Sequence, residues 1–373
     1  MATSSTLDDV AAARKLMAEA VGIDSHIDTI QRVMMGCDLG TRSDAGHVDF
    51  PRLREGKMHA AFFALWVPVF FRGAEAVRRT LDLRDAMQSL LDQHADQIEL
   101  ATTASDIERI VKAHKIAAFS TVEGGHSIDD DLHVLRTYYR LGIRSMTLTH
   151  ARNTNWADSA SDTPANNGLT DFGRDVVNEM NRLGMIVDLS HVSDKTFYDA
   201  LAATTKPVIV SHSSMRAISN VPRNVSDEML RALAKNGGVI GINFGMGFIN
   251  PKDAEALRSA TDTEAEAPLL TGRALDEYAA QNAQQLFGKR AAVVATVEDI
   301  ADHIDHAVKV AGIDHVGIGS DFDGIAGTAN GLEDVSKMPF LTAALLNRGY
   351  GEHELKQLLG QNHLRVIREV TGA

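Results

Sequence analysis

The stretch MIVDLSHVSDKTFYDALAATTKPVIVSH (residues 185–212) contains two short apolar runs separated by a segment of helical character. The runs MIVDLSH (185–191) and PVIVSH (207–212) are nearly continuous in apolar residues, which is typical of strands buried on both faces of a parallel sheet. Between them, Ser193 and Asp194 open a helical segment (193–204) with the residue types that favour a helix start. Each run ends in a histidine, so this unit places two imidazoles at strand ends.

The same alternation extends outward in both directions along the chain. Six further apolar runs are VGIDSHID (21–28), HAAFFALWV (59–67), KIAAFSTVE (115–123), IRSMTLTH (143–150), GVIGINF (238–244) and HVGIGSD (315–321). Apolar residues recur at helical spacing between most of them, at 74–97, 106–113, 130–141, 171–183, 226–236 and 296–311. Eight strands alternating with helices predict an α/β fold of the (β/α)8 TIM-barrel type.

Two segments exceed what a minimal barrel needs. Residues 245–295, between the seventh and eighth predicted strands, are too many for an ordinary loop and are rich in Ala and Glu, so we expect a helical insertion there. Residues 338–373 predict extra C-terminal helices. No linker divides the chain, and residues 1–373 are therefore interpreted as one barrel domain.

Composition excludes several classes of protein. The 373 residues are 44% hydrophobic and 23% charged, which is ordinary for a globular chain. A net charge of −13 argues against a nucleic-acid partner. The single cysteine, Cys37, excludes an internal disulfide framework. No apolar stretch is long enough for a membrane span, and the N-terminus reads as an amphipathic helix and not as a signal peptide, so we expect no membrane anchor and a cytoplasmic location.

Side chains that bind metals or transfer protons gather at the ends of these runs. In a TIM barrel the carboxyl ends of the strands converge at one mouth, where active sites are built. The sequence therefore predicts one shared site from six run ends, which carry His26 with Asp28, Glu123, His150, His191, His212 and Asp321.

The residue types at these ends indicate a metal centre. His26 and Asp28 point to the same side of a strand because side chains alternate, so both can reach one divalent ion. Imidazole and carboxylate suit Zn²⁺, with Mn²⁺ or Co²⁺ as substitutes. Two further histidines suffice for a second ion if Glu123 bridges the pair. Two such ions can hold a hydroxide between them and polarise a substrate oxygen.

Each candidate also has a structural interpretation. A single histidine at a strand end is more often a packing residue than a ligand, and only the combination of six ends favours the metal. Asp321 could cap the helix that follows, and Asp323 competes for its role; we favour Asp321 because it directly follows the strand. Gly124 and Gly125 behind Glu123 permit a tight backbone turn beside a ligand.

These residues lie in blocks that resemble a known family. HIDT (26–29), STVEGGHSI (120–128), TLTHARNTNWADS (147–159), VDLSHVS (187–193), VIVSHSSMRAI (208–218), RNVSDEML (223–230) and GIGSDFDG (317–324) occur in this order. Together, over about residues 21–367, they are similar to the renal (membrane) dipeptidase family of the amidohydrolase superfamily. With one cysteine and no hydrophobic tail, the chain resembles the soluble bacterial members. One block departs from the family: GQNHLRV has His363 where an aromatic residue is common.

The resemblance implies a zinc-dependent dipeptidase with two metal ions per chain. His26 and Asp28 would hold the first zinc ion, and His191 and His212 the second. Glu123 and a hydroxide would bridge the two ions.

The resemblance also implies roles for three further residues. His150 would polarise the scissile carbonyl or steady the tetrahedral intermediate. Arg223, which only the resemblance singles out, would pair with the free carboxylate of the dipeptide. Asp321, beside the first metal and among its ligands, would take the proton of the attacking hydroxide and pass it to the leaving amine.

The expected partner is a small dipeptide, including L-Xaa-D-Xaa forms, which the family generally tolerates. An alternative is another hydrolase of the superfamily, acting on lactones, amides or phosphoesters; such relatives typically carry His-x-His on the first strand and a carboxylated lysine as the bridge, which this chain lacks. A non-catalytic barrel would lack a ligand or the base, and here all six positions are filled. A homodimer through residues 245–295 or the C-terminal helices is a further expectation.

Overall fold

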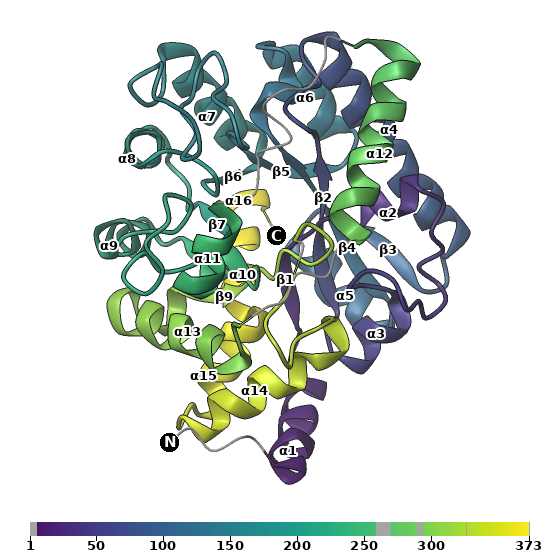
Figure 1. The fold of residues 1–373 in the computed structure, drawn as a ribbon, viewed down its shortest axis with the longest axis vertical. Helices are drawn as coiled ribbons and strands as arrows, with labels where there is room; N and C mark the ends of the chain where they lie inside the picture. The colour runs from purple at the N-terminus through teal and green to yellow at the C-terminus, as the bar shows by residue number, and fades with distance from the viewer. Residues whose placement is uncertain (1–5, 259–269, 289–293, 326, 373) are drawn as a thin grey trace.

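The computed structural model describes residues 6–258, 270–288, 294–325 and 327–372. Eight parallel strands close into a barrel, with the helices outside it (Figure 1). Around the barrel they are β1 (Ile23–Ile27), β2 (Ala60–Trp66), β4 (Ile116–Glu123), β5 (Ile143–Thr147), β6 (Ile186–Asp188), β7 (Ile209–Ser213), β8 (Val239–Ile242) and β9 (Val316–Ile318). Pairing of β2 with β4 on one side and of β1 with β9 on the other completes the ring. The predicted (β/α)8 barrel is confirmed.

A ninth strand, β3 (Ile98–Ala101), lies outside the ring and was not predicted. It pairs with Ile116–Phe119, the first half of the eight-residue strand β4, whereas β5 pairs with the second half from Ser120 onward. The helix predicted over 74–97 therefore ends earlier, as α4 (Ala74–Gln93). The prediction was wrong because the apolar spacing of α4 continues smoothly into the short strand.

The other predicted barrel helices are observed within about two residues of their expected bounds. They are α5 (Ala104–Lys112), α6 (Leu132–Arg140), α7 (Asp171–Leu183), α8 (Asp194–Ala203), α9 (Asp227–Asn236) and α13 (Val297–Ala311). Ser193 and Ser226 cap α8 and α9 by accepting backbone N–H groups, and Gly184 and Gly237 end α7 and α9 in the left-handed conformation. Short helices α2 (Ile30–Met34) and α3 (Phe50–Glu55) follow β1.

The insertion between the seventh and eighth barrel strands contains α10 (Met246–Ile249), α11 (Pro251–Arg258) and α12 (Gly272–Gly288). Figure 1 shows α12 beside α4, on the opposite side of the barrel from α10 and α11. There Arg78 of α4 bonds Asp276 at 2.8 Å, and Glu75 accepts the backbone N–H of Gly272 at 3.1 Å. Charged contacts therefore hold the insertion against the helix that follows β2.

The helices near the two termini lie at the end of the barrel opposite to the carboxyl ends of the strands. Helix α1 (Leu7–Ala18) packs on α14 (Met338–Asn347), and α15 (Glu352–Lys356) leads into α16 (Asn362–Thr371) (Figure 1). His363 is buried beneath β9, where a Cβ on Gly317 would lie 2.2 Å from its ring, so this departure from the family pattern is a packing residue. Within the described residues, no helix combines the length and apolarity that a membrane crossing requires.

Inside the barrel, strands β7 and β9 approach closely at Gly319. A Cβ there would lie 1.8 Å from the carbonyl oxygen of Ser211. Gly319→Ala should therefore lower the free energy of unfolding by about 1–3 kcal/mol or more, because a strand must shift to admit the methyl group. Urea denaturation measures the loss. Gly351→Ala is the control, since its nearest contact would be Glu354 Oε2 at 3.5 Å; equal midpoints for the two variants would contradict the expectation.

Candidate metal centre

All six predicted run ends lie at the same mouth of the barrel. His26 is in β1 and Asp28 follows it; Glu123 is the last residue of β4, and His212 is in β7. His150, His191 and Asp321 follow β5, β6 and β9 by three residues each. The ends of β1 and β9 are bonded through the backbone, from Asp321 N to His26 O (3.1 Å) and from Asp28 N to Phe322 O (2.9 Å). Side chains that are far apart in sequence are thus brought together at the mouth of the barrel.

Glu123 lies at the middle of this group, and its two oxygens face different partners. Oε2 is 3.3 Å from Nε2 of His26, which is itself 3.3 Å from Oδ2 of Asp28. Oε1 is 2.9 Å from Nε2 of His191 and 3.4 Å from Nε2 of His212. The carboxylate therefore stands between a His–Asp pair and a His–His pair.

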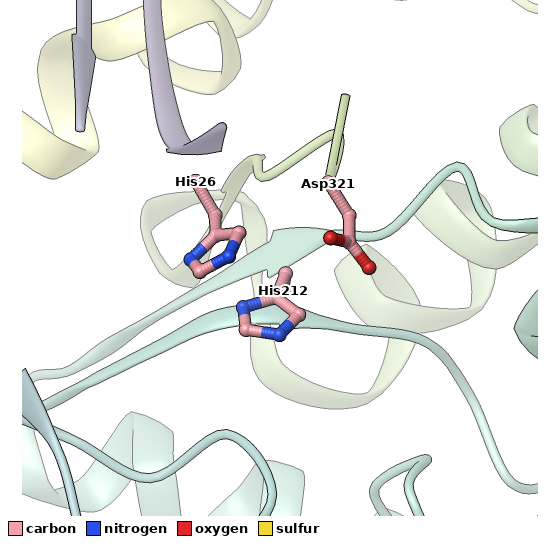
Figure 2. Close-up of side chains that lie close together, drawn as sticks. All are labelled: His26, His212 and Asp321. Carbon is pink, nitrogen blue, oxygen red and sulfur yellow. The ribbon is translucent and has the colours of Figure 1, made fainter. Parts of the chain in front are cut away.

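Asp321 lies beside both halves of the group. Figure 2 shows its side chain close to those of His26 and His212, and each of the three offers a ligand atom within 4.8 Å of the others. The rings of His26 and His212 lie 3.8 Å apart between centroids. Asp323, the competing carboxylate, points elsewhere: it accepts a hydrogen bond from Thr29 and pairs with buried Arg32 at 3.3 Å. The geometry thus favours Asp321 over Asp323 as the site residue.

The electrostatics of the group suit a cation. Burial holds the pKa of His191 and that of His212 well below the usual value, so both imidazoles are neutral; after burial, the largest cause is the positive charge of Arg223 for His191 and that of His26 for His212. Burial and the charge of Glu123 raise the pKa of Asp28 to about 6. Burial also raises the pKa of Asp321 to about 7, where the charge of His26 opposes the rise and that of Asp28 adds to it. A divalent ion would stabilise the ionised form of these crowded carboxylates, and the neutral imidazoles of His191 and His212 each keep a lone pair for it.

Unsatisfied buried atoms support the same fit. Among the residues that the structure describes, both ring nitrogens of His26, Oδ1 of Asp28 and Nδ1 of His191 lack a hydrogen-bond partner. Burying such groups without partners is costly, and ligation to a metal would remove the cost at the atoms that face the site. The donor set of three imidazoles and three carboxylates is one that zinc takes in proteins.

Two candidate residues adopt left-handed backbone conformations. His191 has φ 67° and Asp321 has φ 64°, where residues other than glycine are uncommon. Such conformations cost on the order of 1–3 kcal/mol and concentrate at functional sites. Gly324, three residues after Asp321, cannot carry a side chain, because a Cβ there would lie 2.1 Å from Asp28 Oδ2 and 2.5 Å from Asp321 Oδ1. The SDFDG block therefore shapes the site through its backbone.

Arg223 borders the group from the loop between β7 and α9. Its guanidinium donates to Ser213 Oγ and to the carbonyl of His212, each at 3.2 Å, and lies 5.4 Å from the ring centroid of Phe248. Within the described chain its Nε has no acceptor. Burial lowers the pKa of Arg223 to about 10, and it remains charged. The chain thus uses two of the five guanidinium N–H groups, one each on Nη1 and Nη2, and leaves the buried Nε–H without an acceptor.

His150 lies at the edge of the group, and its surroundings include a residue that sequence reasoning missed. Its Nε2 is 3.9 Å from Glu123 Oε1 and accepts the indole N–H of Trp66 at 3.2 Å. Trp66 is the last residue of β2. Its position at a strand end was the available signal, but a tryptophan is neither a usual metal ligand nor an acid–base group.

Asn243 was missed for the same reason. It directly follows β8 and donates from Nδ2 to Asp321 Oδ2 at 2.9 Å. Gly245 N donates to its Oδ1 at 2.5 Å, which fixes the orientation of the amide. The end of the seventh barrel strand therefore contributes a polar group that holds Asp321.

The sequence matches a family of peptidases. Residues 10–373 match the family described as Membrane dipeptidase (Peptidase family M19). The chain is 38% identical over 339 residues to Dipeptidase tcpJ of Claviceps purpurea, covering 88% of this chain and 71% of that protein. It is 36% identical over 381 residues to Dipeptidase verJ of Clonostachys rogersoniana, covering 97% and 87%.

Solved structures agree in fold over nearly the whole chain. The probable dipeptidase PvdM from Pseudomonas aeruginosa superposes with a TM-score of 0.82 at 26% identity, covering 98% of both chains. A metallo peptidase from Rhodobacter sphaeroides, liganded with a phosphinate mimic of the dipeptide L-Ala-D-Ala, gives a TM-score of 0.78 at 25% identity, covering 94% of this chain and 99% of that one. The chain, with its barrel and its clustered ligands, thus belongs to the membrane dipeptidase family of metallopeptidases.

Proposed function

We propose that this protein is a binuclear zinc dipeptidase that hydrolyses dipeptides with a free C-terminal carboxylate, L-Xaa-D-Xaa dipeptides among them. The placement of Glu123 carries the proposal, because one carboxylate oxygen faces His26 and the other faces His191 and His212. The Rhodobacter relative binds a mimic of L-Ala-D-Ala, which supports the substrate class.

The residues divide into two proposed metal subsites. His26, Asp28 and Asp321 would hold one ion and His191 and His212 the other, with Glu123 shared between them. Ions bound there would supply a hydroxide nucleophile at neutral pH and polarise the scissile carbonyl. The chain itself has to bind the dipeptide, stabilise the developing charge and move one proton.

Arg223 is suited to bind the substrate carboxylate. Its guanidinium is fixed by two hydrogen bonds, is stacked near Phe248, and keeps an N–H without an acceptor in the described chain. A charge-assisted hydrogen bond from a preorientated guanidinium selects a carboxylate over a neutral C-terminus. We therefore assign it the free C-terminus of the dipeptide.

His150 and Asp321 are assigned the chemical step. To donate to the oxyanion, Nε2 of His150 has to carry a proton and release the indole N–H of Trp66 that it accepts in this structure. Asp321, held by Asn243, would take the proton from the attacking oxygen and deliver it to the leaving amine.

Hydrolysis of L-Ala-L-Ala, L-Ala-D-Ala, L-Ala-D-alaninamide and a simple lactone by the zinc-loaded protein tests the substrate class. We expect cleavage of one or both dipeptides, little cleavage of the amide-capped compound and none of the lactone. Faster turnover of the lactone than of the dipeptides would replace the proposal with the alternative superfamily activity.

Arg223→Met should raise KM for dipeptides and lower kcat/KM by about 10- to 100-fold, the value of one or two lost hydrogen bonds to a charged group. Activity on the amide-capped compound should change little, because its C-terminus offers no charge to Arg223. Steady-state kinetics on both substrates measure this. For Arg223→Lys, which keeps the positive charge but not the planar guanidinium, kcat/KM should fall between the values of the wild type and Arg223→Met. Equal losses on both substrates would contradict the assignment.

A further inference from the structure

We infer that Asp188 and Ser211 are positioning residues that set the tautomer of His212 and aim its Nε2 into the metal site. The inference rests on the proposed function, because it takes His212 to be a metal ligand that binds through the lone pair of Nε2. Asp188 is the last residue of β6, and Ser211 precedes His212 in β7. All three side chains are buried.

The hydrogen bonds around Asp188 determine which atom donates and which accepts in the series Asp188, Ser211 and His212. The carboxylate accepts two backbone N–H groups at Oδ1, from Ser190 (3.0 Å) and Ser211 (2.9 Å). At Oδ2 it accepts the hydroxyls of Thr147 and Ser211, each at 2.6 Å. A serine hydroxyl has one proton, so the proton of Ser211 is committed to Asp188. Its other hydroxyl neighbour, Ser190 Oγ, is farther away, at 3.3 Å.

Ser211 Oγ must then act as the acceptor toward His212. The distance from Oγ to Nδ1 of His212 is 2.8 Å, and because the hydroxyl proton points to Asp188, Nδ1 carries the proton of this contact. A neutral imidazole protonated on Nδ1 has its lone pair on Nε2. That nitrogen faces Glu123 Oε1 at 3.4 Å and His191 Nε2 at 2.9 Å. The buried carboxylate thus orients the ring through the serine, as outer partners orient metal-binding histidines.

The same Ser–His sequence occurs in β1, but there the serine hydroxyl does not contact the imidazole. Ser25 precedes His26 as Ser211 precedes His212, but Ser25 Oγ lies against two backbone carbonyls, those of Ser211 (2.6 Å) and Ile318 (2.9 Å), and its one proton is directed to these acceptors. Nδ1 of His26 has no partner in the described chain. The two Ser–His pairs are therefore matched in sequence and burial and differ in whether the serine holds the imidazole. Ser211 should affect metal binding, and Ser25 only packing.

Zinc titration of the metal-free protein against a chromophoric chelator tests the inference. Ser211→Ala should weaken zinc binding at one of the two sites by about 10- to 100-fold and leave the other unchanged. Asp188→Asn should weaken the same site, and Ser25→Ala should match the wild type. Equal affinities in Ser211→Ala and the wild type, or equal losses in Ser211→Ala and Ser25→Ala, would overturn the inference. A wild type that binds no zinc would instead overturn the proposed function.

A spectroscopic measurement on the wild type keeps the inference falsifiable if the variants do not fold. Histidine ¹⁵N NMR of the metal-free protein distinguishes the two neutral tautomers, and a His212→Gln spectrum assigns the signal. We expect Nδ1 of His212 to be protonated and Nε2 to be bare. A proton on Nε2 of His212 would overturn the inference without any reference to activity.

Discussion

Asp321→Asn should abolish dipeptide hydrolysis, with kcat lowered by about 10²- to 10⁴-fold, the usual contribution of a positioned acid–base group. The amide has nearly the shape of the carboxylate but cannot take a proton from the attacking oxygen. The metal content should stay near that of the wild type, because five other candidate ligands remain. Steady-state kinetics and metal analysis on the same sample measure both quantities.

Asp323→Asn is the matched control, because it makes the same change two residues away. Asp323 pairs with Arg32 and Thr29 outside the metal group, so this variant should lose stability but retain kcat per folded molecule. Retained turnover in Asp321→Asn, or an equal loss of kcat in both variants, would contradict the role assigned to Asp321.

Glu123→Gln should disrupt both metal subsites at once. Its two oxygens face His26 on one side and His191 with His212 on the other, and the amide replaces one oxygen by a nitrogen that cannot bind zinc while also removing a negative charge. We expect zinc affinity to fall at both sites by more than the roughly 10- to 100-fold that an outer partner contributes, and hydrolysis to be lost. Chelator competition and kinetics measure these effects.

Glu179→Gln provides the control for this variant. Glu179 is also largely buried, but it pairs with Arg136 and Arg182 on the outer helices, away from the metal group. Its replacement should leave zinc affinity and kcat unchanged. If Glu123→Gln instead lost only one metal ion and kept the other at wild-type affinity, Glu123 would not be shared between the subsites.

The barrel could be predicted because its strands are buried on both faces and its helices alternate with them. Strand β3 could not be predicted, because its sequence IELA (98–101) is short and contains the charged Glu99. It pairs with the first half of β4, and no local sequence pattern shows that this half has room for another strand. The convergence of the six run ends follows from the closed parallel topology alone. The sequence favoured Asp321 over Asp323 because it was expected to follow the strand directly, but β9 ends three residues earlier, at Ile318. Both aspartates are left-handed, and their side-chain contacts distinguish them, since Asp323 bonds Thr29 and Arg32.

The supporting residues were harder to predict. Arg223 lies in a loop eleven residues beyond His212, without periodicity, and only the family resemblance identified it. Trp66 ends β2 and Asn243 directly follows β8, yet tryptophan and asparagine at a strand end are ordinary until the contact with His150 or Asp321 is known. Their roles come from the side chains they meet, which the sequence does not specify.

Zinc content per chain, measured together with hydrolysis of L-Ala-L-Ala and L-Ala-D-Ala on the same preparation, tests the central claim most directly. We expect two zinc ions per chain, loss of hydrolysis when a chelator removes them, and recovery when zinc is returned. Hydrolysis that persists in the metal-free protein, or a protein with two zinc ions that cleaves neither dipeptide, would contradict it.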